Sequence, residues 1–331
     1  MPRLGEFEAI DLFTRGLPRR GPGVAVGIGD DAAVLRPPPG EDLVATVDAV
    51  VEGVHFGDSF APEDVGWKAL AVNLSDVAAM GATPLWALVA LALPRGGNPA
   101  IVGRIGRGLA ACARRFRVSV VGGNLTMASD LSISVTVMGS VRRGRALLRS
   151  GARPGDLVLV SGTLGDAALG LERGAARPLL SRQRRPVPRV ALGRALSGVA
   201  RAAVDVSDGL VQDLSHLCAA SGVGATVQAE RLPLSTAYRR RVRGRPDPLE
   251  AALAGGEDYE LVVALPPSRL GAALRAARAA GTPLAVVGEF RRGNGVRVLK
   301  GGGEPVHLAR TGHDHLRSPI GPVLGRGRGG A

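Results

Sequence analysis

The sequence is poor in aromatic residues and in cysteine, and it contains no long apolar run. Phe, Trp and Tyr make up 3% of its 331 residues, so aliphatic side chains must supply the core. No uninterrupted apolar stretch reaches the roughly 18 residues of a membrane-spanning helix, and residues 1–13 carry acids, unlike a signal peptide. The two cysteines, Cys112 and Cys218, lie far apart in alanine-rich segments, which favours a reducing compartment. We therefore expect a cytoplasmic protein without a membrane partner.

Lysine is almost absent, and the formal charge of +13 comes from arginine. The only lysines are Lys68 and Lys300, whereas arginines are spread along the chain and into the segment 325–330. A large positive charge is typical of nucleic-acid-binding proteins. Few aromatic side chains are present to stack on bases, however, and the spread of arginines fits a composition bias equally well. A basic RNA-binding protein stays open as an alternative, but the pattern disfavours nucleic acid as a partner.

The length and the order of apolar segments predict two α/β domains. Helical and strand-like patterns alternate in the first half, at 6–15, 42–47, 63–80, 85–93, 99–115, 118–121 and 131–138. The pattern restarts after residue 154, with strands and helices at 156–162, 190–199, 202–206, 210–220, 261–265 and 270–280. The Pro- and Arg-rich stretch 178–188 is expected to be a surface connection. We place the domains at 1–148 and 149–318 and a disordered Gly/Arg tail at 319–331.

Acidic residues in the first half occupy positions that folding alone does not explain. Asp30 and Asp31 lie side by side between glycines and a short apolar run. Such a pair indicates either a site for a cation or metal-bound polyphosphate, or a solvated turn. Asp48 follows the strand expected at 42–47. Asp76 falls on the apolar stripe of the helix expected at 63–80, where an unpaired acid is costly to bury, unless it turns outward near the helix end.

A second set of acids stands at a predicted strand-to-helix turn in the second half. Asp205 and Asp208 flank Ser207 there, where α/β proteins often bind ligands. A helix N-cap would explain Asp208 but not Asp205. Oxygen ligands suit hard cations such as magnesium, and carboxylates combined with glycine-rich loops suggest a nucleotide phosphate bound with the metal.

The motifs of two common kinase classes are missing. A P-loop needs Gly-Lys followed by Ser or Thr, and neither lysine has these neighbours. A protein kinase needs a lysine on an early strand and a His-Arg-Asp loop, and the sequence has neither. A bound nucleotide would therefore be held by metal ions, backbone groups and arginine.

Six segments, in their order and spacing, resemble the thiamine-monophosphate kinase family. They are 27–31, 46–48, 51–56, 73–82, 205–209 and 255–261. The resemblance runs from about Gly5 to Leu316. It implies an α/β (α+β) protein with the two-domain fold of aminoimidazole ribonucleotide synthetase, whose N-terminal sheet serves for dimerisation and whose C-terminal domain is α/β. It also implies a homodimeric phosphotransferase, a thiamine-phosphate kinase, that uses ATP and magnesium to convert thiamine monophosphate to thiamine diphosphate.

The resemblance carries over to site residues position by position. The positions that match magnesium ligands are Asp31, Thr46, Val47, Asp48, Asp76, Asn124, Asp205 and Asp208, with Asp30 as a second ligand or a support of its loop. The positions that match ATP contacts are Gly123, Asn124, Arg149 and Ser207. The positions that match contacts to thiamine monophosphate are His55, Glu257 and Leu316.

Three of these positions depart from the family pattern. Asn124 stands where the family often has Asp, so a neutral carbonyl oxygen replaces a charged ligand and magnesium should bind more weakly. Val47 replaces a hydroxyl and leaves only its backbone carbonyl for a metal. Leu316 stands where an aromatic side chain usually packs on the substrate, so that stacking is lost while apolar contact can remain.

Charge considerations then predict direct in-line transfer without a phosphoenzyme and without a catalytic side chain. The phosphate of thiamine monophosphate is already anionic near neutral pH and needs little or no general base. Magnesium ions held by Asp31, Asp48, Asp76 and Asp205 would neutralise the two polyanions. Another ATP-dependent synthetase or kinase of the same superfamily stays open as an alternative. Selenophosphate synthetase is disfavoured within it, because no cysteine precedes Cys112.

Overall fold

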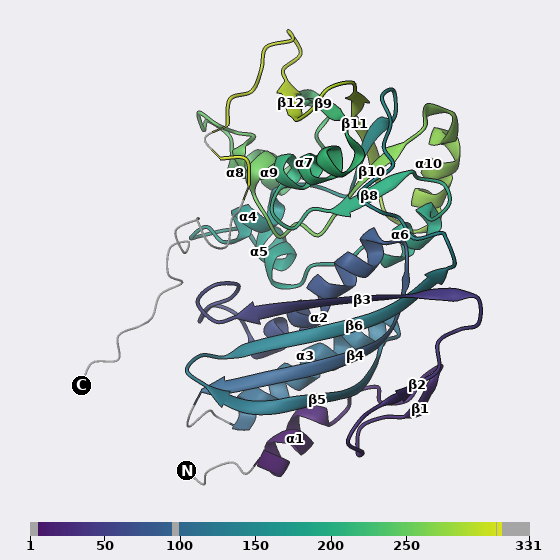
Figure 1. The fold of residues 1–331 in the computed structure, drawn as a ribbon. Coiled ribbons are helices and arrows are strands. Elements are labelled where there is room, and N and C mark those ends of the chain that lie inside the picture. The colour runs from purple at the N-terminus through teal and green to yellow at the C-terminus, as the bar shows by residue number, and fades with distance from the viewer. Residues whose placement is uncertain (1–5, 95–98, 309, 313–331) are drawn as a thin grey trace. The chain divides into compact units, whose positions relative to one another are not determined.

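The computed structural model describes residues 6–94, 99–308 and 310–312, which form two compact units (Figure 1). Within these ranges the first unit comprises the chain up to Val77 together with Pro84–Ser140. The second unit comprises Ala78–Thr83 and the chain from Val141 onward. Leu316 and the tail predicted at 319–331 lie outside the described residues, and the domain boundary at residue 148 stays a prediction. Among the described helices, none has the length and apolarity needed to cross a bilayer.

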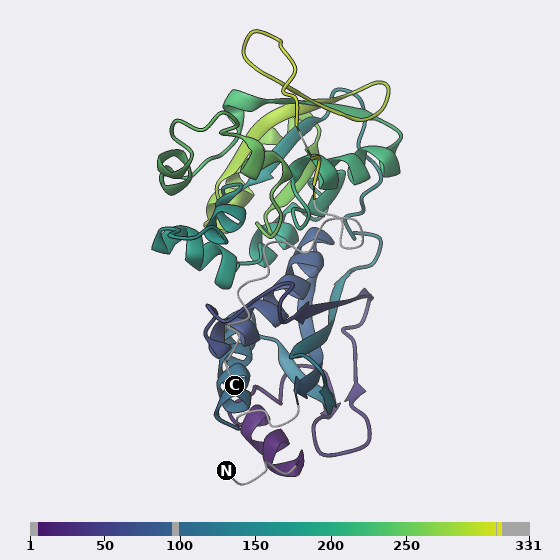
Figure 2. The same ribbon diagram turned by 90° about the vertical axis from the view of Figure 1, so that its left-hand side faces the viewer.

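The first unit is built on a four-stranded sheet with helices on one face. Its strand order is β3 (Glu41–Val51), β6 (Ser132–Arg142), β4 (Thr83–Pro94) and β5 (Ser119–Ala128), and β4 and β5 run parallel. Figures 1 and 2 show α2 (Pro62–Ala79) and α3 (Pro99–Phe116) along one side of these strands. Buried and less buried residues alternate along β6, as expected for a sheet with one covered face.

Smaller elements lie beside this sheet. Helix α1 (Glu6–Thr14) packs on α3, and β1 (Val24–Val26) pairs antiparallel with β2 (Val34–Leu35). The segment between β1 and β2 contains Asp30 and Asp31.

Helices α2 and α3 approach so closely that only glycine fits at their contact. A Cβ atom on Gly66 of α2 would overlap the carbonyl oxygen of Ile105, and one on Gly108 of α3 would overlap the carbonyl oxygen of Glu63. At the edge of this contact Glu63 accepts hydrogen bonds from Arg104 at 2.8 to 3.0 Å. These hydrogen bonds hold the pKa of Glu63 down, at about 2. The contact fixes α2, which carries Asp76.

The second unit is a six-stranded sheet that is buried on both faces. Its strand order is β12 (Val296–Leu299), β9 (Gly224–Gln228), β11 (Leu284–Arg291), β7 (Leu157–Ser161), β10 (Leu261–Leu265) and β8 (Ala202–Asp205). Neighbouring strands are antiparallel except for β12 and β9. Val158 and Val262 belong to the core under α7 (Leu210–Ser221), while Leu159 and Val263 on the opposite face are also fully buried. The unbroken apolar strands at 157–161 and 261–265 follow from this double burial.

The remaining elements of the second unit are short helices. They are α4 (Asp166–Gly170), α5 (Arg177–Arg184), α6 (Val190–Leu196), α8 (Thr236–Arg241), α9 (Glu250–Ala254) and α10 (Leu270–Ala279), with single turns at Ala229–Arg231 and Pro267–Arg269.

Three expectations about local structure are wrong. The stretch 178–188 is not only a surface connection, because α5 starts with Pro178 in its first turn and buries Leu179 and Gln183 one turn apart. Asp48 does not follow a strand but lies inside β3, which continues to Val51. The strand expected at 118–121 does not end there either, because β5 runs through Gly122 and Gly123 to Ala128. The strand β9 was not expected. It begins with glycine, and in so short a segment the alternation of Ala225 and Val227 with Thr226 and Gln228 is a weak signal.

We expect Gly108→Ala to destabilise the first unit by about 1–3 kcal/mol, because the added methyl group collides with the backbone of α2. Gly103→Ala on the same helix is the matched control. Its Cβ would lie 3.8 Å from the nearest atom, and the better helix propensity of alanine should raise stability by up to about 1 kcal/mol. Both tryptophans, Trp67 and Trp86, lie in the first unit, so urea unfolding followed by their fluorescence reports on it. Equal unfolding midpoints for the two variants would contradict this account of the helix contact.

Candidate active site

Helix α2 and strand β3 bring together three of the residues that the resemblance assigns to magnesium. The Thr46 hydroxyl donates a hydrogen bond of 2.6 Å to Oδ2 of Asp76. Asp48 lies two residues further along β3, hence on the same face as Thr46 and about 7 Å away. The carboxylate of Asp76 is therefore oriented by the strand that carries the other two residues.

Asn73, one turn before Asp76 on α2, fixes the strand against the helix. Its side chain is completely buried. Its Oδ1 accepts a hydrogen bond from the N–H of Asp48 at 2.9 Å, and its Nδ2 donates to the carbonyl of Ala69 at 3.0 Å. The sequence analysis gave Asn73 no role. The available signal was a second polar residue on the same stripe of the helix as Asp76.

The oxygen atoms of Thr46, Asp48 and Asp76 fit a magnesium ion in kind and in number. Mg²⁺ usually binds protein through one or two carboxylates and takes its other ligands from water and substrate phosphates. No group of three or more His, Cys, Asp or Glu residues that could hold a metal is found in the described ranges. Two carboxylates and a hydroxyl form an incomplete cage of the kind that a nucleotide phosphate completes.

The side chain of Val47 points away from this group. It is 62% exposed and, as a neighbour of Thr46 and Asp48 in the strand, it lies on the opposite face of the sheet. The replacement of a hydroxyl by valine therefore does not change the side chains that face Asp76.

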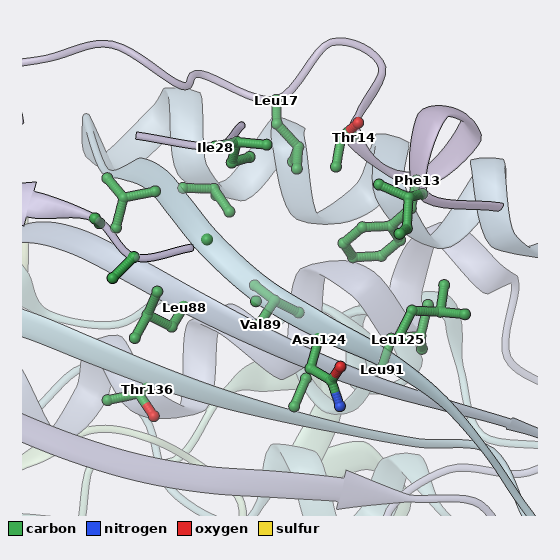
Figure 3. Close-up of a pocket in the computed structure, with 18 of the residues that line it drawn as sticks. Phe13, Thr14, Leu17, Ile28, Leu88, Val89, Leu91, Asn124, Leu125 and Thr136 are labelled. Carbon is green, nitrogen blue, oxygen red and sulfur yellow. The ribbon is translucent and has the colours of Figure 1, made fainter. Parts of the chain in front are cut away.

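A cavity of about 680 Å³ lies in the first unit (Figure 3). Asp30 and Asp31 are among its lining residues. Its walls are mainly aliphatic, with Phe13 and Leu17 near α1, Leu88 on β4 and Thr136 on β6. The N–H of Asp31 donates to Oδ1 of Asp30 at 2.9 Å, so Asp30 supports the turn that presents Asp31.

Gly123 and Asn124 of β5 line the same cavity. Gly123 pairs with Val89 on the parallel strand β4, and a Cβ atom on Gly123 would overlap the Val89 carbonyl. Glycine at this position is thus required by the neighbouring strand. Asn124, which Figure 3 shows on the strand beside Leu125, is exposed.

His55 is held by hydrogen bonds in the turn after β3, and its N–H donates to the carbonyl of Val51 at 2.9 Å. The N–H of Val51 donates to His55 Nδ1 at 3.1 Å, and Lys68 Nζ donates to the His55 carbonyl at 2.9 Å. Because Nδ1 acts as an acceptor, the proton of the neutral ring resides on Nε2, which is then a donor. Lys68 is completely buried, with Nζ 5.5 Å from the centre of the Phe60 ring. Its role was missed, although it is one of only two lysines in an arginine-rich chain.

In the second unit, Asp213 shapes the turn that contains Ser207 and Asp208. Its Oδ2 accepts hydrogen bonds from the N–H groups of Ser207, Asp208 and Gly209 at 3.0 to 3.1 Å. Burial raises the pKa of Asp213 to about 7 and outweighs these backbone donors. The N-cap of α7 is Gly209, so the N-cap interpretation of Asp208 is wrong. The carboxylate of Asp208 instead accepts a hydrogen bond of 3.2 Å from Gln212 Nε2.

The loop that carries Glu257 lies along the same turn. The N–H of Glu257 donates to the carbonyl of Ser207 at 2.8 Å, and the N–H of Tyr259 donates to the carbonyl of Val206 at 2.8 Å. Asp205 ends strand β8 beside this turn and is 4% exposed. The structure thus brings Asp205, Ser207, Asp208 and Glu257 into one neighbourhood of the second unit.

Arg149 and Leu316 are the remaining predicted site residues. Arg149 is exposed, and its carbonyl accepts a hydrogen bond of 3.0 Å from the hydroxyl of Ser221. Leu316 lies outside the described part of the chain.

Comparison with known proteins identifies the family. The models described as AIR synthase related protein, N-terminal domain, and AIR synthase related protein, C-terminal domain, match residues 29–141 and 153–300. The thiamine-monophosphate kinase of Salmonella typhimurium is 39% identical over 326 residues, which cover 95% of this chain and 99% of that protein. The thiamine-monophosphate kinase structure from Stenotrophomonas maltophilia K279a has a TM-score of 0.82 and 42% identity, over 92% of this chain and 99% of that chain.

A second solved structure is described as AaThiL complexed with AMPPCP and TMP. It has a TM-score of 0.75 and 36% identity, over 94% of this chain and 97% of that chain. These matches extend over both units and over nearly the full length of each relative. The chain therefore belongs to the thiamine-monophosphate kinase family.

Proposed function

We propose that this chain is a thiamine-phosphate kinase, which transfers the γ-phosphoryl group of ATP to thiamine monophosphate and yields thiamine diphosphate. The observation that carries the proposal is the group of Thr46, Asp48 and Asp76, oriented by α2 and β3. The complex of the relative AaThiL with AMPPCP, an ATP analogue, and TMP supports the choice of both substrates.

The chemistry asks the protein to bring two polyanions together, and it does not require a basic side chain. The phosphate of thiamine monophosphate is anionic near neutral pH and can attack phosphorus directly. Magnesium, when bound, would neutralise the phosphates and stabilise charge on the transferred group. Asp31, Asp48, Asp76 and Asp205 are the residues that we propose to hold it. Thr46 adds a hydroxyl oxygen to this set and orients Asp76.

The other site residues position the substrates. His55 carries the proton of its neutral ring on Nε2 and is therefore a hydrogen-bond donor, and Glu257 supplies a carboxylate, so both suit thiamine monophosphate. Ser207 offers its hydroxyl to ATP, because its N–H is already bound to Asp213. Arg149 adds a fixed positive charge.

We assign the cavity of the first unit to part of the ATP molecule. Its volume of about 680 Å³ lies in the range of small-molecule sites, and its aliphatic walls suit a nucleobase. Asp30 and Asp31 line it together with Gly123 and Asn124, which places acidic oxygen atoms beside the phosphate-binding region of the proposal.

We propose a homodimer formed through the uncovered face of the four-stranded sheet. Leu43 and Val47 lie on this face, and their side chains are 56% and 62% exposed. Apolar side chains on an uncovered sheet face are more often covered by a partner than left in water.

We place the enzyme in the cytoplasm, where thiols stay reduced. Cys112 and Cys218 are buried and form no disulfide in the structure. Burial raises the pKa of Cys218 to about 11, which keeps its thiol protonated and inert.

The direct test of the proposal uses purified protein with magnesium, ATP and thiamine monophosphate, with thiamine diphosphate as the measured product. We expect turnover by the wild type and a loss of about a hundredfold or more in Asp76→Asn, which removes a charged metal ligand. Asp58→Asn, a change at an exposed acid outside the site, is the control. Near-normal activity of Asp76→Asn would overturn the proposed site. Steeply salt-dependent RNA binding without ATP turnover would favour the RNA-binding alternative.

A change at Asn124 should alter the magnesium requirement. Asn124→Asp adds a charged oxygen ligand, so we expect half-maximal activity at about three- to tenfold lower magnesium concentration, at fixed ATP. Asn124→Ala removes the oxygen and should shift the requirement in the opposite direction. Identical magnesium curves for both variants and the wild type would exclude Asn124 as a ligand.

The uncovered sheet face can be tested by light scattering coupled to gel filtration. We expect the wild type to have about twice the chain mass of 33.9 kDa and Leu43→Glu to shift toward the monomer, since it buries a charge in the proposed interface. Leu171→Glu, at an exposed apolar residue of the second unit, should leave the mass unchanged. A monomeric wild type, or a Leu43→Glu variant that stays dimeric, would refute the interface.

A further inference from the structure

The loop from Gly255 to Glu260 has an unusual backbone. Glu257 and Tyr259 have φ angles of 69° and 51°, in the left-handed region that favours glycine. Among the other described non-glycine residues only Arg117 shares this conformation. Strain of this kind persists where the surrounding structure holds the segment at several points, and it concentrates at functional sites.

The side chains on either side hold the backbone of this loop. Asp258 is buried and accepts a hydrogen bond of 2.6 Å from the N–H of Gly165. Glu260 has no exposed side-chain surface and accepts hydrogen bonds from Ser161 at 2.6 Å, Arg182 at 2.5 Å and Arg189 at 2.5 to 2.6 Å. These contacts fix where the Glu257 side chain begins.

Gln183 contacts the carboxylate of Glu257. Its Nε2 donates a hydrogen bond of 2.9 Å to Oε2 of Glu257. The side chain of Gln183 is 2% exposed and lies on the buried side of α5 next to Leu179. Its neighbour Arg182 forms the ion pair with Glu260, so one helix contacts the loop at both Glu257 and Glu260.

We propose that Gln183 is a positioning residue for thiamine monophosphate: its amide orients the carboxylate of Glu257 toward the organic half of the substrate. This assignment rests on the proposed function. Thiamine carries a cationic thiazolium ring and an amino group, and an ionised carboxylate attracts or accepts hydrogen bonds from both. A neutral amide donor orients this carboxylate without cancelling its charge. Gln183 therefore contributes to the binding of thiamine monophosphate and leaves phosphoryl transfer itself unaffected.

The competing view is that Gln183 only fills space in the core. Two substitutions separate the views because both preserve the size of the side chain. Gln183→Met removes the donor. Gln183→Glu places a second carboxylate against Glu257, which repels when ionised and donates a hydrogen bond when protonated.

The pH dependence of the Glu variant has to be read against the other charges around it. Several charged or titratable groups influence the pKa of a carboxyl group at position 183. They belong to the loop 255–260, to α5, to the segment after α5 and to α4, and they are Glu257, Asp258, Glu260, Arg182, Arg184, Arg189 and Asp166. All of them are present in the wild type as well, so the ratio of variant to wild type at each pH isolates residue 183.

The experiment measures KM for thiamine monophosphate, KM for ATP and kcat between pH 6 and 8. For Gln183→Met we expect about a tenfold rise in KM for thiamine monophosphate at every pH, with the other two constants within about twofold of wild type. For Gln183→Glu we expect a larger rise at pH 8 that declines toward pH 6 as the new carboxyl group gains a proton. Ser181→Ala, at an exposed residue of the same helix, should match the wild type throughout.

A double-mutant cycle with Glu257→Gln completes the test, because Gln183→Met should add little to a protein that already lacks the carboxylate.

If the wild type turns over thiamine monophosphate and Gln183→Met has an unchanged KM for it, the role of Gln183 is overturned while the proposed function stands. The assignment is also overturned if both variants show a rise in the two KM values and a fall in kcat that are equal in size and independent of pH, since a space-filling role predicts this result. If Gln183→Met does not fold, Gln183→Glu decides the question. A KM for thiamine monophosphate that falls back toward the wild-type value at pH 6 supports the assignment, and a KM that does not fall overturns it. A wild type without turnover of thiamine monophosphate refutes the proposed function, and the assignment falls with it.

Discussion

The structure depends on how its carboxylates are held in place before any cation binds. Asp76, Asp208 and Glu257 each accept a hydrogen bond from a neutral donor, namely Thr46, Gln212 and Gln183. A neutral donor orients a carboxylate without reducing its negative charge. An arginine in the same place would orient the carboxylate equally well but would compete with the cation for its charge.

Three acids that serve the fold are held by arginine side chains. Glu63, Glu172 and Glu260 each accept hydrogen bonds from two arginines. Each of these clusters carries a net positive charge, which gives part of the arginine excess a structural use. Around Glu260 the pair of arginines also makes burial of a carboxylate tolerable, because a buried charge must be paired and hydrogen-bonded. The strained loop with Glu257 depends on this cluster.

The sequence pattern singled out the main acids of the proposed site but not the residues that hold them. Asp76 could be found because an acid interrupts an apolar stripe, and Asp205 and Asp208 because they flank a strand-to-helix turn. Gln183 and Asp213 lie in helices beside other polar residues, so the pattern does not reveal their burial, whereas Asn73 lies on the same stripe as Asp76 and could have been found there. The helix α5 was missed for a related reason: four arginines and two prolines in 177–186 mask the pair Leu179 and Gln183 that faces the core. The fold class followed from the alternation of elements and the family resemblance, whereas the ends of β3 and β5 are set by pairing with strands distant in sequence.

The turn at residues 206–209 shows how a buried carboxylate changes the kind of ligand that the start of a helix can bind. Three successive N–H groups at the start of a helix would ordinarily form a site for phosphate. Here Asp213 accepts all three hydrogen bonds, so an anion cannot bind to the backbone of this turn. What the turn offers to a ligand is the hydroxyl of Ser207 and the carboxylate of Asp208. An internal carboxylate thus converts an anion-binding geometry into one that suits a cation. The carboxylate of Asp208 repels a polyanion at this turn, which agrees with the metal ligand role that we propose for the acids of the site.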